Sequence, residues 1–136
     1  MAEPTVVDLT WKGGLVFEGR AADSGMRLDS EGKQGPSPVQ ALLLALAGCM
    51  AMDVAAILAK ARLDLRGIRA HLTADRADEP PRRVVRVSLH FTVEGDVDAE
   101  RVERAIALSH DKYCSVWHSM RQEIPFTTSF EVVKPS

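Results

Sequence analysis

Apolar and polar residues alternate along two long stretches near the middle of the chain. In residues 82–94, five apolar side chains occupy every second position between polar ones: Val85, Val87, Leu89, Phe91 and Val93. A period of two predicts a strand of an antiparallel sheet with one buried face. Residues 65–75 also have the composition of a strand, and the polar, proline-containing segment 78–81 marks a turn. We therefore expect two long neighbouring strands here.

Shorter strands are predicted towards both ends of the chain. Residues 5–11 and 15–20 are rich in apolar and β-branched residues and flank a Lys-Gly-Gly turn, which predicts a β-hairpin. A third short strand is expected at 26–29, after an Asp-Ser-Gly turn at 23–25. A closing strand is expected at 126–134.

Three segments are predicted to be helical. The longest begins at Ser37 and Pro38, because Ser is a good N-cap and Pro fits the first helical position, and it runs to about Arg62. Asp98 caps a second helix, and a short third helix is expected at 114–122. The resulting order, βββ-α-ββ-α-α-β, separates strands from helices unevenly and predicts an α+β fold.

The long helix is apolar on every face between Ala41 and Met52. A helix of that kind must be covered on all sides. A chain of 136 residues is one domain's worth of sequence and offers little else to cover it. We therefore expect a single domain, residues 1–136, that forms a homodimer with this helix at or near the subunit interface.

Composition excludes several classes of protein. The formal net charge is −2 and no run of basic residues occurs, which argues against nucleic acid or an anionic membrane surface as a partner. The longest uncharged apolar stretch, residues 41–52, is shorter than the roughly 20 residues of a membrane span. The N-terminal residues lack the basic and apolar regions of a signal peptide. We expect a cytoplasmic protein.

The two cysteines are the main candidates for chemistry. Two are too few for a disulfide-stapled scaffold or a four-cysteine zinc site. Cys49 lies in the middle of the long helix, where it is either a small buried apolar residue or a thiolate stabilised by a nearby cation. Asp53, four residues later, can share its face of the helix; the favoured interpretation is that it marks where the helix meets solvent or pairs with a cation.

Cys114 has a different setting, at the start of the short third helix. Free N–H groups at a helix start can lower the pKa of a thiol. His110 and His118 lie four residues to either side, so each can share a face with it; the alternative is ordinary packing with histidines at the surface. A Cys/His metal site is not expected, because the spacing contains no C-x-x-C or H-x-x-x-H unit.

Two motifs around these cysteines resemble those of one family. Residues 35–49 read GPSPVQALLLALAGC, and residues 112–116 read KYCSV. The first is similar to the family pattern of a Gly, a small polar residue, a Pro, an acidic residue, an apolar helix and a Cys preceded by small residues. The second resembles the family's second cysteine motif. With this order of elements, the chain resembles the OsmC/Ohr family, the osmotically inducible and organic-hydroperoxide-resistance proteins, over nearly its whole length.

The resemblance implies a fold and an activity. Family members are intertwined homodimers in which antiparallel sheets wrap around long central helices, and the peroxidases among them reduce organic hydroperoxides at a cysteine pair. By resemblance, Cys49 is the attacking thiolate and Cys114 the resolving thiol. The implied partners are a small organic hydroperoxide as substrate and a dithiol reductant, with no cofactor and no metal.

The chain departs from the family pattern beside the reactive cysteine. Family peroxidases carry a Glu directly after the helix-opening Pro, where it orients an Arg; this chain has Val39, followed by Gln40, which can offer a hydrogen bond. Asp29 occupies the position of one branch's Arg. Arg27 lies two residues before it and is the expected substitute, with Arg20 second.

This departure leaves two alternatives to a hydroperoxide reductase. One is a non-peroxidatic thiol protein that binds an apolar or persulfide-bearing ligand in the same pocket, for example in sulfur handling. The other is a ligand-binding or structural dimer in which Cys49 lies in a filled, dry core.

Overall fold

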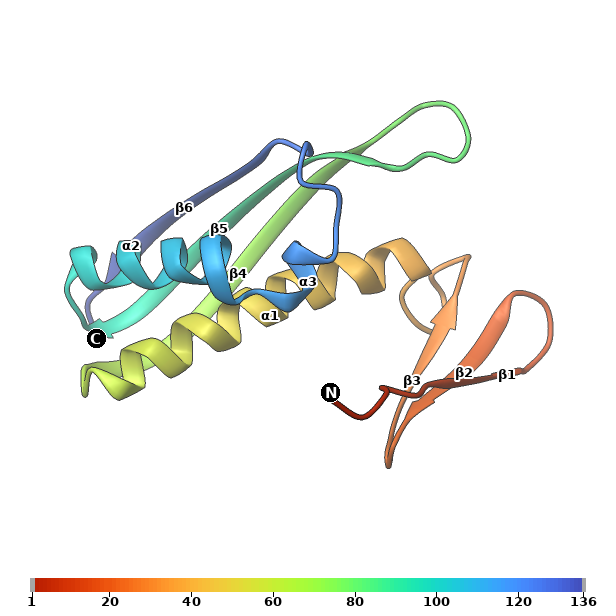
Figure 1. Ribbon diagram of the computed structural model, residues 1–136, viewed down its shortest axis with the longest axis horizontal. Coiled ribbons are helices and arrows are strands. Elements are labelled where there is room, and N and C mark those ends of the chain that lie inside the picture. Colours follow the sequence, from red (N-terminus) through yellow and green to blue (C-terminus); the bar gives the residue numbers. More distant parts are fainter. Residues whose placement is uncertain (1, 136) are drawn as a thin grey trace. The chain divides into compact units, whose positions relative to one another are not determined.

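The computed structural model describes residues 2–135 of the chain. They form two compact units, Met1–Leu44 and Ala45–Ser136, which are described separately. The order of elements is βββ-α-ββ-α-α-β, as predicted, with one additional π-helical segment before the last short helix. Two three-stranded sheets and helices make up the chain, which confirms the α+β class (Figure 1).

The sheet of the N-terminal unit is an antiparallel meander of β1 (Asp8–Trp11), β2 (Val16–Ala21) and β3 (Ser24–Asp29). The predicted Lys-Gly-Gly turn joins β1 to β2, and both its glycines have positive φ, which glycine adopts without strain. The second turn comes earlier than predicted. Ala22, with a φ of 54°, makes the reversal, and the expected turn residues Ser24 and Gly25 already belong to β3.

Asp29 organises the loop that follows β3. Its side chain is buried, with 3% exposure, and its carboxylate accepts backbone N–H bonds from Glu31 (2.9 Å), Lys33 (3.2 Å) and Gln34 (3.0 Å). These bonds, that from Gln34 most of all, hold the pKa of the Asp29 carboxyl below its usual value. Asp29 therefore has a structural role, because it holds the loop through these three bonds. The same loop needs glycine at position 35, where a Cβ would collide with the backbone carbonyl of Arg27.

Asp29→Ala should loosen this loop. We expect the amide protons of Glu31, Lys33 and Gln34 to exchange at least about tenfold faster at neutral pH, because their common acceptor is lost. Asp29→Asn, which keeps one acceptor oxygen, should have a smaller effect. Hydrogen exchange followed by NMR measures this. Because the pKa is lowered, protection in the parent should persist above pH 3.8 and be lost as the pH falls through the folded-state value. Unchanged exchange in Asp29→Ala would contradict this role.

Helix α1 (Pro38–Lys60) begins as predicted, at a capping box. The Ser37 hydroxyl accepts from the Gln40 N–H at 3.2 Å, and the Gln40 side-chain oxygen accepts from the Ser37 N–H at 2.9 Å. The helix ends two residues earlier than expected, because Arg62 adopts a left-handed conformation with a φ of 58°. Fully buried residues recur at every fourth position, on one face: Leu46, Met50, Val54 and Leu58.

Other faces of α1 expose large apolar side chains. Leu44 is 62% exposed and Met52 74% exposed. Taken whole, α1 has the length and composition of a membrane span, with a mean hydropathy of 2.3 over its most apolar window, although a core helix of a soluble protein meets the same criteria. The uncharged apolar stretch of residues 41–52 is by itself too short for a membrane span. Asp53 ends that stretch, but the helix stays apolar beyond it, so the length of the stretch does not exclude a span.

The C-terminal unit is built on a sheet ordered β4-β5-β6, formed by β4 (Asp64–Arg76), β5 (Val84–Asp96) and β6 (Phe126–Val133). The alternation seen in the sequence of β5 is confirmed. Four of its apolar residues are at most 1% exposed: Val87, Leu89, Phe91 and Val93. Together with the buried face of α1, they form much of the core.

The expectation of purely antiparallel sheets is wrong for one pair of strands. β4 and β5 pair antiparallel, whereas β6 pairs parallel to β5. The reason is the helical connection between β5 and β6. It carries the chain back to the end of the sheet at which β5 starts, so β6 begins beside the start of β5, as a parallel pair requires (Figure 1).

That connection contains α2 (Ala99–Leu108), the π-helix η1 (Ser109–Tyr113) and α3 (Ser115–His118). Asp98 is the N-cap of α2, as predicted, although its side chain makes no capping hydrogen bond. The predicted third helix at 114–122 is too long, since α3 ends at His118. The preceding η1 was not predicted, because five residues of wide helical turn leave no distinct periodicity in the sequence.

Candidate functional site

Cys49 and Cys114 are neighbours in the C-terminal unit. Cys49 lies on α1 and is partly exposed, whereas Cys114 is the N-cap residue of α3 and is fully buried. Both thiols are free, and Cys49 lies near enough to Cys114 to influence the ionisation of its thiol. Residues 65 positions apart in the sequence are thus brought into one neighbourhood; their roles as attacking and resolving thiols stay predictions. In the single chain Cys49 is partly exposed; the third alternative, in which Cys49 lies in a filled, dry core, stays open.

The surroundings of Cys114 favour its protonated form. Burial, which has the largest effect, and the neighbouring Cys49 together raise the pKa of the Cys114 thiol to about 11. The backbone N–H of Trp117 donates to the Cys114 sulfur at 3.3 Å and acts in the opposite direction. The expectation that the start of a helix lowers this pKa is therefore wrong in sign, because desolvation outweighs the N–H contribution. Cys114 is a neutral thiol at physiological pH.

The raised pKa predicts a pH dependence of stability. The folded state holds the Cys114 proton more tightly than the unfolded state, whose value is near 9.0. The contribution to stability is therefore fully present below pH 9 and lost as the pH rises to about 11. It amounts to at most about 3 kcal/mol. Urea unfolding of the reduced protein between pH 8 and 11 should show a steeper loss for the parent than for Cys114→Ala; parallel profiles would contradict the assignment.

A second contact joins the same two segments. The Ser109 hydroxyl, fully buried at the start of η1, donates to the Asp53 carboxylate of α1 at 2.8 Å. The sequence allowed Asp53 to share the face of Cys49 but did not identify Ser109 as its partner. Ser109 carries no signal in the sequence, because its role depends on the unpredicted η1.

The two histidines beside Cys114 make packing and backbone contacts. His110 stacks on Trp117, with ring centroids 5.6 Å apart, and also contacts Phe126 at 5.2 Å. His118 Nε2 contacts the backbone carbonyl of His110 at 3.1 Å. Trp117 is buried and packs edge-on against Phe126. These contacts support the packing interpretation of both histidines. Among residues 2–135, no group of three or more His, Cys, Asp or Glu side chains is arranged to hold a metal ion.

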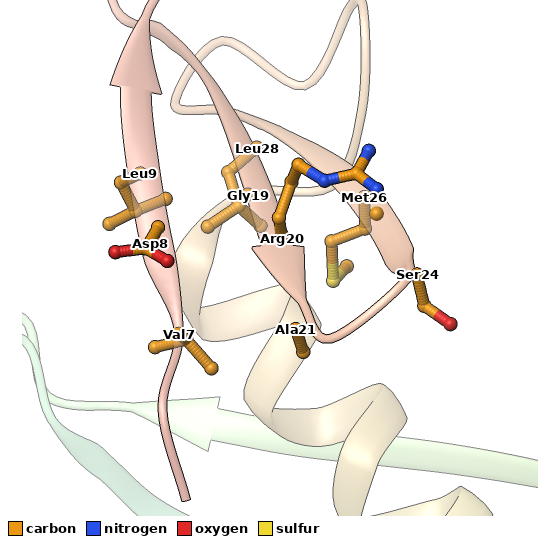
Figure 2. Close-up of a pocket in the computed structure, with 10 residues that line it drawn as sticks. Val7, Asp8, Leu9, Gly19, Arg20, Ala21, Ser24, Met26 and Leu28 are labelled. Carbon is orange, nitrogen blue, oxygen red and sulfur yellow. The ribbon is translucent and has the colours of Figure 1, made fainter.

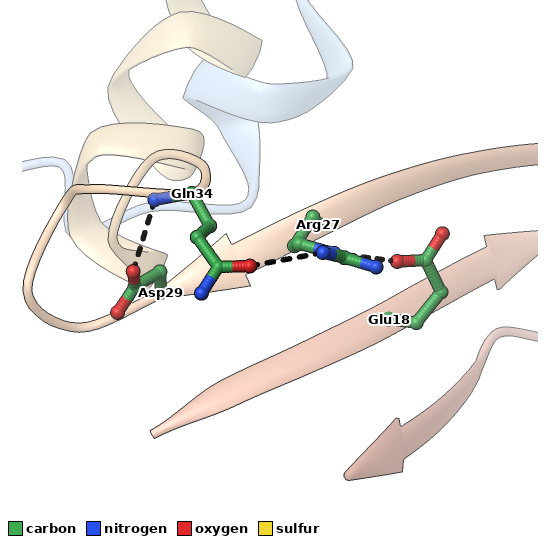
Figure 3. Close-up of polar contacts among 4 residues, drawn as sticks. All are labelled: Glu18, Arg27, Asp29 and Gln34. Atoms are coloured by element: carbon green, nitrogen blue, oxygen red, sulfur yellow. Dashed lines mark hydrogen bonds and ion pairs between the residues drawn. The ribbon is translucent and has the colours of Figure 1, made fainter. Parts of the chain in front are cut away.

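Arg27 and Gln40 belong to the N-terminal unit, where each already has partners. Arg27 forms an ion pair with Glu18 across β2 and β3 (3.0 Å), and its guanidinium also donates to the side chain of Gln34 at 3.0 Å (Figure 3). Gln40 completes the capping box of α1.

Arg20 donates to the carbonyl of Asp23 at 3.4 Å. That Arg27 or Arg20 serves as the cation beside Cys49 stays a prediction.

The sheet of the N-terminal unit carries an apolar hollow of about 360 Å³. Val7, Leu9, Met26 and Leu28 are among the apolar residues that line it, and Arg20 is among the polar ones (Figure 2). Val7 is 65% exposed and Leu9 59% exposed. Within the N-terminal unit, this hollow is an exposed apolar surface.

Comparisons with known proteins agree with this architecture. The family model described as OsmC-like protein matches residues 30–129. Protein YhfA of Escherichia coli strain K12 is 41% identical over 127 residues, covering 90% of this chain and 94% of YhfA. A hypothetical protein from Aquifex aeolicus VF5 superposes with a TM-score of 0.91 at 24% identity, covering 99% of this chain and all of that one.

A structure described as an organic hydroperoxide resistance protein OsmC and predicted redox protein from Legionella pneumophila shares the fold. Its TM-score is 0.70 at 16% identity, with 96% of this chain and 98% of that chain covered. The family model spans both cysteine motifs and most of the chain, and YhfA matches almost end to end. The chain therefore belongs to the family of OsmC-like proteins.

Proposed function

We propose that this protein is a cysteine-pair-dependent organic hydroperoxide reductase acting in oxidative stress defence. The Cys49 thiolate attacks the terminal oxygen of an alkyl hydroperoxide. The S–O bond forms as the O–O bond breaks, and the alkoxide leaves and takes a proton from water to become an alcohol. Sulfur loses two electrons and becomes a sulfenic acid, and the peroxide is reduced.

Cys114 completes the reaction. Its thiol sulfur attacks the Cys49 sulfenic acid, the S–S bond forms, and the sulfenic hydroxyl leaves with the thiol proton as water. A dithiol reductant then reopens the disulfide by exchange and is itself oxidised to a disulfide. The protein's own residues supply the two thiols and their placement.

The observation that carries this proposal is the asymmetry of two neighbouring thiols. Cys49 is partly exposed, so a small substrate can reach it, whereas Cys114 is fully buried and its pKa is raised to about 11. An accessible first thiol with a shielded second thiol near it supports capture of a sulfenic acid as a disulfide, and the raised pKa of Cys114 supports its assignment as the second rather than the first to react. The family relationship and the fold shared with the Legionella hydroperoxide resistance protein support the same assignment.

Steady-state turnover tests the proposal. With a dithiol reductant in excess, purified protein should reduce cumene hydroperoxide catalytically, and hydrogen peroxide at least about tenfold more slowly, because an apolar surround selects the alkyl group. Peroxide loss and alcohol formation should match one to one. Cys49→Ser is the matched control. Turnover no faster than this control would overturn the proposal.

We also propose that the protein acts in the cytoplasm as a homodimer, with a second copy covering the apolar side chains left exposed. Sedimentation at micromolar concentration should give twice the chain mass. Met52→Glu, on the exposed face of α1, should raise the dimer dissociation constant at least about tenfold, whereas Lys33→Glu, in an exposed loop, should not. A fully helical monomer, or flotation of the parent with lipid vesicles, would contradict this assembly.

A second candidate function rests on the placement of Arg27. Its guanidinium is already engaged by Glu18 and Gln34, and Val39 replaces the family's Glu. A thiol protein that binds an apolar or persulfide-bearing ligand needs no cation at Cys49. This candidate predicts transfer of sulfane sulfur from a small persulfide to Cys49, seen as a 32 Da gain, with no hydroperoxide turnover.

A further inference from the structure

We propose that Asp53 and Ser109 form a positioning pair that sets the separation and approach of the two thiols. The inference rests on the proposed role of Cys49 and Cys114 as a redox pair. Neither Asp53 nor Ser109 contacts the substrate in the proposed reaction. They act through the two segments that carry the sulfur atoms.

A side-chain hydrogen bond joins η1 to α1. Ser109 is fully buried and donates its hydroxyl proton to the Asp53 carboxylate at 2.8 Å. A hydrogen bond to a carboxylate is stronger than one between neutral groups, and leaving the buried Ser109 hydroxyl unpaired carries a further cost. The bond therefore holds α1 and η1 in one register.

Each member of this bond is tied to one of the cysteines. Asp53 follows Cys49 by four residues on the continuous helix α1, so the two side chains lie on one face, a single turn apart. Ser109 is tied to Cys114 through η1, where the Cys114 N–H donates to the Ser109 carbonyl at 2.8 Å across the wide turn of a π-helix. Single π-helical turns occur frequently at functional sites.

These contacts connect the two cysteines. Cys49 leads to Asp53 through one turn of α1, Asp53 to Ser109 through the 2.8 Å bond, and Ser109 to Cys114 through η1; Cys49 in turn lies near enough to Cys114 to influence its ionisation. The disulfide-forming step requires sulfur atoms in a narrow range of distance and direction. A misplacement of about 1 Å can slow a positioned reaction 100-fold. The Asp53–Ser109 bond is the member of this series that a single substitution can remove without altering either thiol.

The test separates the two chemical steps by rapid quenching and intact-mass measurement after one equivalent of cumene hydroperoxide. In Ser109→Ala and Asp53→Ala, the first oxidation of Cys49 should stay within about threefold of the parent. Closure of the disulfide should slow at least about tenfold, and the Cys49 sulfenic acid, about 16 Da above the reduced chain, should accumulate. Asp53→Asn keeps an acceptor oxygen and should restore closure to within about threefold of the parent.

Two controls keep the result specific. Ser119→Ala removes a similar serine hydrogen bond, to the carbonyl of Ser115 at 2.8 Å, in the same region, and should change neither step. The double variant Ser109→Ala/Asp53→Ala should close no more slowly than either single variant, because the two residues act as one unit.

A readout independent of peroxide chemistry distinguishes failure of this inference from failure of the proposed function. Equilibration of the oxidised protein with dithiothreitol gives the stability of the Cys49–Cys114 disulfide, which should fall at least about tenfold in Ser109→Ala and recover in Asp53→Asn. If the parent shows this equilibrium but no peroxide turnover, only the proposed function fails. Equal equilibrium constants in parent, Ser109→Ala and Asp53→Ala would overturn the positioning pair.

Discussion

Cys49→Ser should abolish reduction of organic hydroperoxide, with turnover falling at least about 1,000-fold to the background of the assay. A serine hydroxyl is not ionised near neutral pH and cannot accept the peroxide oxygen, and the buried Cys114 cannot replace Cys49 because its thiol stays protonated, with a pKa of about 11. Intact mass after peroxide treatment should show Cys114 largely unreacted in this variant.

The reciprocal variant should behave differently. Cys114→Ser should react with its first equivalent of peroxide at a rate close to the parent's, because Cys49 is unchanged. Without a resolving thiol, its sulfenic acid should proceed to sulfinic and sulfonic acid, with mass gains of about 32 and 48 Da. Similar oxidation of the two single variants would mean that the pair has no defined attacking and resolving members.

The largest effect on stability should come from Phe91→Ala, about 3–5 kcal/mol of unfolding free energy. Phe91 is fully buried at the centre of β5, opposite Ala70 on one neighbouring strand and Phe130 on the other. Removing its ring leaves a cavity that a close-packed sheet cannot fill. Urea unfolding at one fixed protein concentration measures the change, since assembly also contributes to apparent stability.

Glu94→Ala is the matched control for this substitution. It lies three residues along the same strand with its side chain exposed, and should change stability by less than about 0.5 kcal/mol. A loss below about 1 kcal/mol in Phe91→Ala would mean that the buried face of β5 does not hold the core together.

Elements governed by local chemistry were predictable from the sequence. The alternation in β5 sets its buried face, and Ser37, Pro38 and Gln40 mark the start of α1 through contacts within four residues. The parallel pairing of β5 and β6 and the π-helix η1 were not predictable, because both depend on how the helical connection packs.

The same distinction between local and long-range contacts applies to the candidate site. The cysteine motifs identified the two thiols, and in the structure Cys49 lies near enough to Cys114 to influence its ionisation. The sign of the pKa change at Cys114 was missed, because burial cannot be read from a helix start. Gln40 was assigned to the site from its place beside Val39, but the structure uses it to cap α1. Ser109 was missed because its partner Asp53 lies 56 residues away in the chain.

Peptide mapping of the parent protein after a single equivalent of cumene hydroperoxide, without reductant, tests whether Cys49 and Cys114 form a peroxide-reducing pair. We expect loss of both thiols and one disulfide linking Cys49 to Cys114, with a mass 2 Da below that of the reduced chain and one equivalent of alcohol released. Two free thiols after exposure, or sulfinic acid on Cys49 with Cys114 still reduced, would contradict it.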